Sequence, residues 1–171
     1  MIAKPHIEDV NNYFSSYIDQ VRETDLMLAL ENNLKTTVDF FESIPFEKED
    51  YAYDVDKYSI KEVFIHLLDT ERIVAYRALR FGRKDATDLA GYEDEQYVST
   101  SNVKTRTLTD LIEEFKSVRQ STIFLFRHLS DESLDFKGRA NKNETSARIC
   151  GWVIVGHTIH HCKVISERYL D

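Results

Sequence analysis

The most apolar part of the chain is the segment ICGWVIVGHTIHHCKVI, residues 149–165. Its apolar side chains recur at helical spacing without a proline, so the segment predicts a long buried helix. His157 and His161 are four residues apart, which on a helix is about 40° of rotation and roughly 6 Å of rise. Both imidazoles therefore lie on one face, where their nitrogens can bind the same divalent metal ion.

Zinc metalloproteases use the same four-residue spacing, but their motif also has a glutamate directly after the first histidine. Here Thr158 follows His157, so the spacing does not indicate a protease. Buried histidines are also common as ordinary core residues bonded to carbonyl groups. A metal site and a core pair therefore both remain open interpretations.

A metal site needs a third ligand from elsewhere in the chain, which has six histidines. His6 lies in an N-terminal arm and His128 near the end of a predicted helix. His160 lies about 60° around the helix from the face that carries His157 and His161. His66, inside a second apolar helix, is the remaining candidate.

The composition predicts one domain over residues 1–171, since the chain is 42% hydrophobic and 12% aromatic. The formal net charge of -8 disfavours binding to nucleic acid. No apolar run is long enough to span a membrane and the N-terminus has no signal core, so we expect a cytoplasmic protein. Cys150 and Cys162 would lie about 18 Å apart on one helix, so we expect free thiols.

Four long helices are predicted after a leading helix or arm at residues 10–21. Thr24 can cap the first, which Pro45 stops, and Ser59 with Glu62 forms a capping box for the second. The remaining boundaries are Gly82 after the second helix, Thr107 and about Leu129 for the third, and Thr145 or Ser146 and about Leu170 for the fourth. No strand is predicted.

The long connection at residues 82–106 shows no apolar period and constrains the topology. About 25 residues can run back along a helix of roughly 30 Å, so the second and third helices can be parallel. We therefore predict an all-α, up-down-down-up four-helix bundle. This order puts His66 and the histidine pair at a similar depth near one end, beside a pocket walled by residues 46–58 and 98–106.

Further side chains have two interpretations each. Asp69, about 60° around the helix from His66, can orient a ligand imidazole or a bound water, or is a solvated or capping carboxylate. Four charged side chains further along the same helix mark either a substrate patch or ordinary salt bridges. They are Glu71, Arg72, Arg77 and Arg80.

Two glycines in the last helix each cost it about 1 kcal/mol relative to alanine. We expect close helix packing at Gly151 and Gly156.

Six segments in this order and spacing resemble the DinB-like superfamily, the damage-inducible four-helix bundles. They are YSIKEV at 58–63, HLLDTER at 66–72, YRALRF at 76–81, GYED at 91–94, GHTIHH at 156–161 and ERYL at 167–170. One departure is Tyr58, where the family usually has tryptophan. It bears on packing at the start of that helix and leaves the histidines intact.

The resemblance implies an up-down-down-up bundle, often a homodimer, with a divalent metal held by His66, His157 and His161. Superfamily members include S-transferases and isomerases that use a low-molecular-weight thiol, and others are classed as metal-dependent hydrolases. Imidazole ligands favour zinc or nickel, and three protein ligands leave a coordination position open. We therefore expect a metal-dependent S-transferase or hydrolase acting on a small molecule. The alternatives are a non-catalytic metal-binding stress-response or interaction bundle, and a bundle whose histidines are only core residues.

Overall fold

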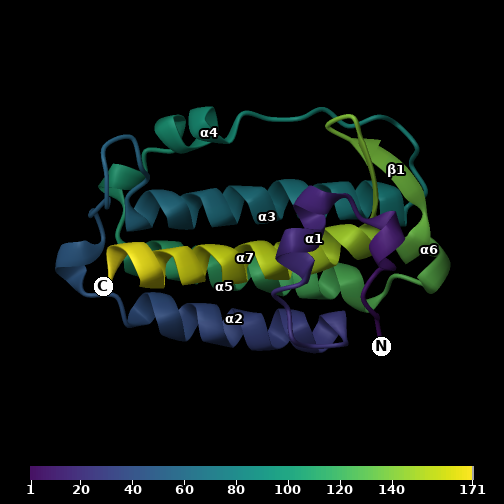
Figure 1. Cartoon of the computed structure of the whole chain (residues 1–171), viewed down its shortest axis with the longest axis horizontal. Coiled ribbons are helices and arrows are strands. Elements are labelled where there is room, and N and C mark those ends of the chain that lie inside the picture. The colour runs from purple at the N-terminus through teal and green to yellow at the C-terminus, as the bar shows by residue number, and fades with distance from the viewer. Residues whose placement is uncertain (171) are drawn as a thin grey trace.

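Four long helices form the molecule in the computed structural model, which describes residues 1–170 and all their side chains except that of Ile7. They are α2 (Leu26–Glu42), α3 (Ile60–Gly82), α5 (Leu108–Arg127) and α7 (Ala147–Tyr169). α2 and α7 run in one direction and α3 and α5 in the other (Figure 1). The predicted up-down-down-up order is therefore confirmed.

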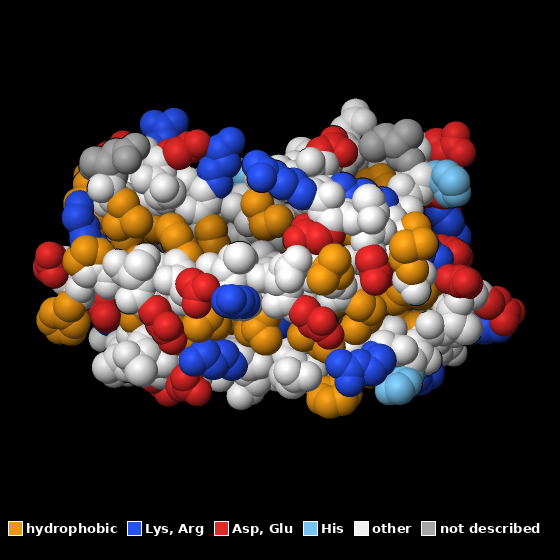
Figure 2. Space-filling view, turned by 90° about the horizontal axis from the view of Figure 1, so that it is seen from below, with side chains coloured by type: hydrophobic (Ala, Val, Ile, Leu, Met, Phe, Trp, Pro, Cys, Tyr) orange, Lys and Arg blue, Asp and Glu red, His pale blue; other side chains and the backbone are white. Residues whose placement is uncertain are grey.

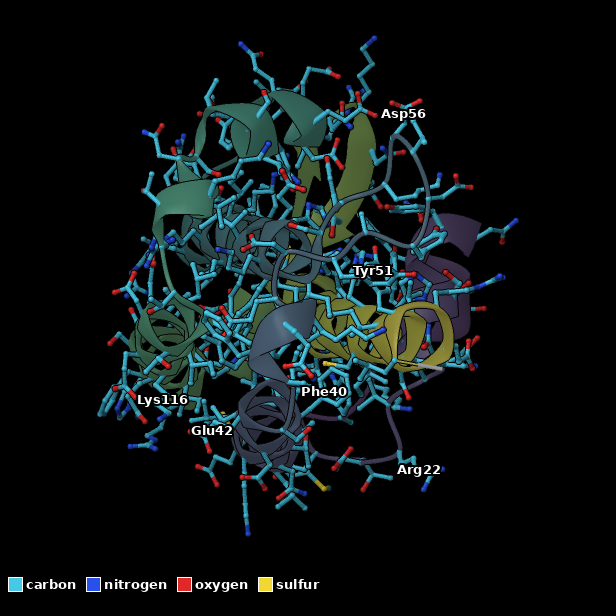
Figure 3. The ribbon with its side chains drawn as sticks, turned by 90° about the vertical axis from the view of Figure 1, so that its left-hand side faces the viewer. Arg22, Phe40, Glu42, Tyr51, Asp56 and Lys116 are labelled. Carbon is cyan, nitrogen blue, oxygen red and sulfur yellow. The ribbon has the colours of Figure 1, made fainter. Side chains whose placement is uncertain are left out.

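Each long helix packs against two others, so the bundle has a square cross-section. α3 contacts α7 and α5, and α2 contacts α5 and α7. Figure 3 shows this arrangement end-on, with Glu42 of α2 and Lys116 of α5 at the edge where these two helices meet. Lys116 Nζ lies 3.6 Å from Glu42 Oε1 there. Because α3 and α7 are antiparallel neighbours, the start of α3 lies beside the end of α7.

The predicted starts of three helices are confirmed by their caps. Ser59 Oγ accepts from the backbone N–H of Glu62, and the Glu62 carboxylate accepts from that of Ser59 at 2.8 Å, which completes the capping box of α3. Thr107 caps α5 by accepting from the backbone N–H of Asp110, and Ser146 caps α7 by accepting from that of Ile149. The cap predicted at Thr24 is wrong by one residue, because Asp25 precedes α2 and its carboxylate accepts from the N–H of Ile2 at 2.8 Å.

The connections contain more structure than the sequence predicts. Short α-helices are present at α1 (Asn12–Ile18), α4 (Asp94–Thr100) and α6 (Asp131–Asp135). 3₁₀ helices lie at Ile7–Asp9, Phe46–Lys48 and Val103–Thr105. α4 interrupts the long connection, which runs back along α3 from the end of that helix toward the start of α5 (Figure 1).

A small antiparallel hairpin precedes α7, so the prediction of no strand is wrong. It pairs β1 (Lys137–Ala140) with β2 (Asn143–Ser146). Asn141 and Lys142 form its turn in the left-handed region, with φ of 49° and 66°. Burial alternates along β1, but neither strand contains a large apolar side chain and few of their residues favour strands, so the sequence shows no strand signal. Leu89 of the long connection exchanges two backbone hydrogen bonds of 2.9 Å with the hairpin, which anchors the connection.

A buried polar network joins all four long helices at the centre of the bundle. Arg119 of α5 is 0% exposed, and its guanidinium donates to both carboxylate oxygens of Glu71 on α3 at 2.8 Å. It also donates to Asn33 Oδ1 on α2 and, at 3.3 Å, to Thr158 Oγ1 on α7. Of the four charged side chains on α3 considered above, Glu71 is thus a core residue, whereas Arg72 pairs with Glu114 and Arg80 with Asp85.

Acidic and basic side chains are interspersed on the face of the molecule that includes α2 (Figure 2). On this face, Lys and Arg side chains are separated by acidic and apolar ones. Among the described residues, no helix is both long and apolar enough to cross a membrane.

The substitution Glu71→Ala should destabilise the fold by about 3–5 kcal/mol, because it leaves the buried guanidinium of Arg119 without its counter-charge. Urea unfolding of the variant and the unaltered chain measures this difference. The double variant Glu71→Leu with Arg119→Met removes both charges and should be more stable than Glu71→Ala. A double variant that is less stable than the single one would contradict this account of the network.

Candidate metal centre

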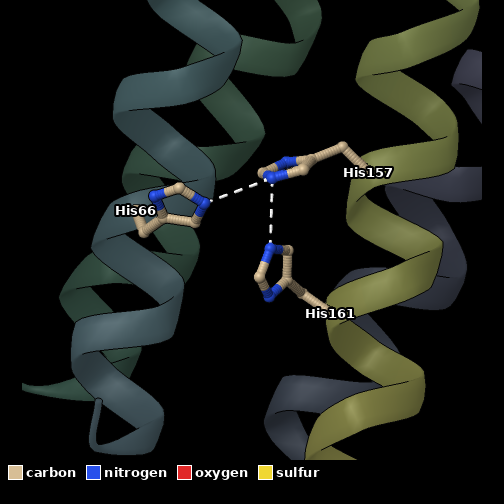
Figure 4. Close-up of side chains that lie close together, drawn as sticks. All are labelled: His66, His157 and His161. Carbon is tan, nitrogen blue, oxygen red and sulfur yellow. Dashed lines mark hydrogen bonds between the residues drawn. The ribbon is translucent and has the colours of Figure 1, made fainter. Parts of the chain in front are cut away.

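The structure brings together the three histidines singled out in the sequence. His66 comes from the second turn of α3, and His157 and His161 come from α7 beside it (Figure 4). His157 Nε2 lies 3.2 Å from His66 Nε2 and 3.1 Å from His161 Nε2. The antiparallel packing of α3 and α7 therefore points three ring nitrogens at a common position.

These distances fit a shared metal ion. Bonds of about 2.0–2.1 Å from a metal to imidazole nitrogens separate neighbouring nitrogens by roughly 2.8–3.0 Å in octahedral geometry and roughly 3.3–3.4 Å in tetrahedral geometry. Hydrogen bonding alone fits less well, because His157 Nε2 contacts two other nitrogens and a ring nitrogen makes only one strong in-plane hydrogen bond. A cation would satisfy all three nitrogens at once.

Burial keeps the three imidazoles neutral, with free lone pairs. It lowers the pKa of His157 well below its ordinary value, and repulsion from the neighbouring histidines acts in the same direction. Burial and the same repulsion lower the pKa of His161 to about 3. The pKa of His66 is also lowered by burial, although the charge of Asp94 partly opposes this. Neutral imidazole is the form that binds a metal ion.

Asp94, at the start of α4, is the carboxylate that the structure places beside the cluster. Its Oδ2 lies 4.0 Å from His66 Nδ1, the ring nitrogen opposite the cluster. Asp69 lies instead 3.6 Å from Arg72 and near Glu114. Asp94 belongs to the GYED segment, but an irregular connection gives no periodicity from which its position beside His66 could be predicted.

A cavity of about 670 Å³ adjoins the histidines. Tyr58 contributes to its wall, as expected for the connection at 46–58, but the lining described by the structure includes no residue of 98–106. The other walls come from α1, the region of Tyr92 and Asp94, and the hairpin. The prediction of the pocket walls is therefore only partly right.

Helix α1 forms one wall because it packs directly on α7. Gly156 permits this approach, since a Cβ atom at this position would lie 2.2 Å from the carbonyl oxygen of Tyr17. The ring of Tyr17 then meets the rings of His157 and His160 edge-on, each at 5.4 Å between centroids. Gly151 similarly makes room for Leu26 and Phe126, so both glycines serve the close packing that the sequence predicts. Cys150 and Cys162 are free, as expected.

A family model described as the DinB superfamily matches residues 29–165 of the chain. The protein belongs to the DinB superfamily. No curated protein matches it. Among solved structures, this DinB-superfamily protein is similar to YfiT from Bacillus subtilis, with a TM-score of 0.70 and 16% sequence identity. The similarity covers 96% of this chain and 91% of YfiT, which is described as "a probable metal-dependent hydrolase with an unusual four-helix bundle topology". At this identity the similarity shows a shared fold.

Without metal, this DinB-superfamily protein should become less stable as the pH falls from about 6.5 toward 4. The folded-state pKa of the cluster histidines lies below the unfolded value, so the unfolded state binds more protons in this window. Each such imidazole adds a slope of up to about 1.4 kcal/mol per pH unit to the free energy of unfolding. Urea unfolding of chelator-treated protein at a series of pH values measures this slope.

The matched control for this experiment is His161→Leu, which removes one buried titrating group. Its stability should depend less steeply on pH over the same window. Equal slopes for the variant and the unaltered chain would show that His161 does not titrate as described.

Proposed function

We propose that this protein is a metal-dependent hydrolase, with a divalent ion held by His66, His157 and His161 and a small-molecule substrate in the adjoining cavity. The observation that carries this proposal is the convergence of three imidazole nitrogens within 4.8 Å of one another, with His157 Nε2 lying 3.2 Å from that of His66 and 3.1 Å from that of His161. When bound, such an ion supplies Lewis-acid activation of water or of a carbonyl group near neutral pH. The likeness to YfiT supports the same assignment.

Asp94 is suited to orient one ligand. A proton on His66 Nδ1 would face the Asp94 carboxylate at 4.0 Å, which favours the tautomer whose Nε2 lone pair points to the cluster. In this role Asp94 takes the place that the sequence suggested for Asp69.

Tyr58 is suited to donate a hydrogen bond to the substrate. Its hydroxyl is buried and has no hydrogen-bond partner among the described residues, while its ring centroid lies 6.2 Å from that of His66. Burial raises the pKa of Tyr58, so its hydroxyl stays protonated at neutral pH. A protonated donor beside the histidines can stabilise negative charge that develops on a substrate oxygen.

The cavity favours turnover over a purely metal-binding role. A non-catalytic bundle would be expected to have a blocked site and a fourth protein ligand, such as Asp69, whereas Asp69 contacts Arg72 and the histidines adjoin about 670 Å³ of space. This volume also accommodates a small thiol together with an electrophile, so a thiol-dependent S-transferase is the second candidate. Three further properties remain predictions from the sequence: zinc or nickel as the metal, a homodimer, and a cytoplasmic location.

Metal binding should depend on the three clustered histidines and not on their neighbour His160. The purified chain without a tag should bind one Zn²⁺, and His66→Ala should weaken this binding at least about tenfold because one ligand is lost. Calorimetric titration and elemental analysis measure affinity and content. His160→Ala is the matched control, since His160 lies on the same helix outside the cluster, and it should bind as the unaltered chain does. Equal affinity of His66→Ala and the unaltered chain would contradict the site.

Hydrolysis of a panel of small esters, amides and lactones by the Zn²⁺- or Ni²⁺-loaded protein tests the activity. Tyr58→Phe should lower kcat by about 10²-fold because it removes one hydrogen-bond donor to the substrate oxygen, and metal content should not change. Full metal occupancy without turnover of any substrate would instead favour the non-catalytic alternative. Turnover that appears only when a low-molecular-weight thiol is added would favour the S-transferase.

A further inference from the structure

The cavity extends well beyond the three histidines, along the boundary between α3 and α7. On α3 its lining residues are His66, Thr70, Val74 and Arg77, at steps of four, four and three residues. These steps keep the four side chains on one helix face, and the helix rises about 16 Å from the first to the last. The cavity is therefore elongated, with His66 at one end and Arg77 at the other.

α7 lines the opposite side with the same periodicity in the reverse direction. Counting from the histidine end, its lining residues at steps of four are His161, His157, Val153 and Ile149, and Cys150 lines the cavity beside Ile149. Because α3 and α7 are antiparallel, the start of α7 lies opposite Arg77. Burial raises the pKa of the Cys150 thiol to about 11, and the nearby positive charge of Arg77 acts in the opposite direction.

Beyond Thr70, toward Arg77, the cavity is lined mainly by apolar side chains. Val74, Val153 and Ile149 are 9%, 6% and 1% exposed, and Phe14 of α1 adds an aromatic ring to this part of the lining. The hydroxyls of Thr70 and Tyr92 line the cavity nearer His66 and bond each other at 2.9 Å. An alkyl segment beside Val74 and Val153 would be stabilised by burial.

The far end carries a positive charge that the protein does not neutralise. Arg77 is the single Lys or Arg among the described residues that line the cavity. Its guanidinium donates to the carbonyl oxygen of Ala90 at 3.1 Å and lies 5.9 Å from the centre of the Tyr92 ring. Within residues 1–170 it forms no ion pair with a carboxylate, whereas the fully buried Arg119 pairs with Glu71.

The polar neighbours of Arg77 at this end are neutral. The hairpin supplies the amides of Asn141 and Asn143 and the hydroxyl of Thr145 to the lining. Asp94, the one acidic residue among the described lining residues, lies at the opposite end beside His66. The cavity is therefore bipolar, and its far end is suited to an anion that accepts hydrogen bonds from a guanidinium.

We propose that the cavity binds an elongated organic anion of the medium-chain carboxylate type. Its carboxylate pairs with Arg77, its alkyl segment lies against Val74, Val153 and Ile149, and its other end reaches the histidines. The assignment of this ligand as the substrate rests on the proposed function, whereas the anion site at Arg77 does not depend on a metal.

Binding of octanoate and of octanamide, measured by calorimetry in the presence of EDTA, tests the anion site separately from metal and turnover. The unaltered chain should bind octanoate at least about tenfold more tightly than octanamide, because only the carboxylate forms a charge-assisted pair with Arg77. Arg77→Met should abolish this preference by weakening octanoate binding about tenfold, with octanamide binding unchanged. His66→Ala should keep the preference even though it lacks a metal ligand.

The matched control is Arg80→Met, since Arg80 lies on the same helix outside the cavity lining and pairs with Asp85. It should bind both probes as the unaltered chain does. Three outcomes would overturn the proposal. The first is that the unaltered chain binds no octanoate, the second is that Arg77→Met binds octanoate as tightly as the unaltered chain does, and the third is that Arg77→Met binds neither octanoate nor octanamide. A chain that shows the octanoate preference but hydrolyses nothing would leave the anion site established and the proposed function wrong.

Discussion

The buried contact between Arg119 and Glu71 is the constraint on which the rest of the bundle depends. Two charges that are 0% and 3% exposed have lost their hydration, and they are tolerated because they pair through two hydrogen bonds of 2.8 Å. Asn33 and Thr158 occupy further donors of the same guanidinium, so every long helix contributes one group. Any packing that separated Arg119 from Glu71 would leave a buried charge without a partner. Apolar packing alone would not exclude such arrangements as strongly, because apolar surfaces are less specific about register.

The same network sets the relative position of the helices that carry the histidines. Glu71 follows His66 by five residues on α3, which is about 140° of rotation, so one side chain faces the bundle centre and the other faces the cavity. Thr158 directly follows His157 on α7 and likewise faces Arg119. When Arg119 holds Glu71 and Thr158, it fixes how far α3 is shifted along α7. The spacing between the three ring nitrogens is thus a consequence of a polar contact on the other side of the same two helices.

The walls of the cavity have a different origin from its floor. The floor consists of side chains from regular positions on α3 and α7, whereas the walls come from α1, the long connection and the hairpin. These segments are held by particular contacts, such as the packing of Tyr17 over Gly156 and the pairing of Leu89 with the hairpin. Asp94 and Tyr92 lie on the long connection, and Tyr58 lies on the shorter connection that precedes α3. The polar groups around the histidines therefore depend on connections, while the three histidines themselves depend on the rigid helices.

The sequence by itself determined the four long helices, most of their caps, the up-down-down-up order and the three histidines. Each of these follows from local spacing or from connection length, and local spacing is independent of the rest of the fold. Only the tertiary structure decided that Asp94 rather than Asp69 approaches His66, that α1 and a hairpin enclose the cavity, and that Arg77 lies at its far end whereas Glu71 lies in the core. These outcomes depend on which side chains meet across elements distant in the chain. Irregular connections carry no periodicity that encodes such contacts, and short strands are stabilised by their partners rather than by their own sequence.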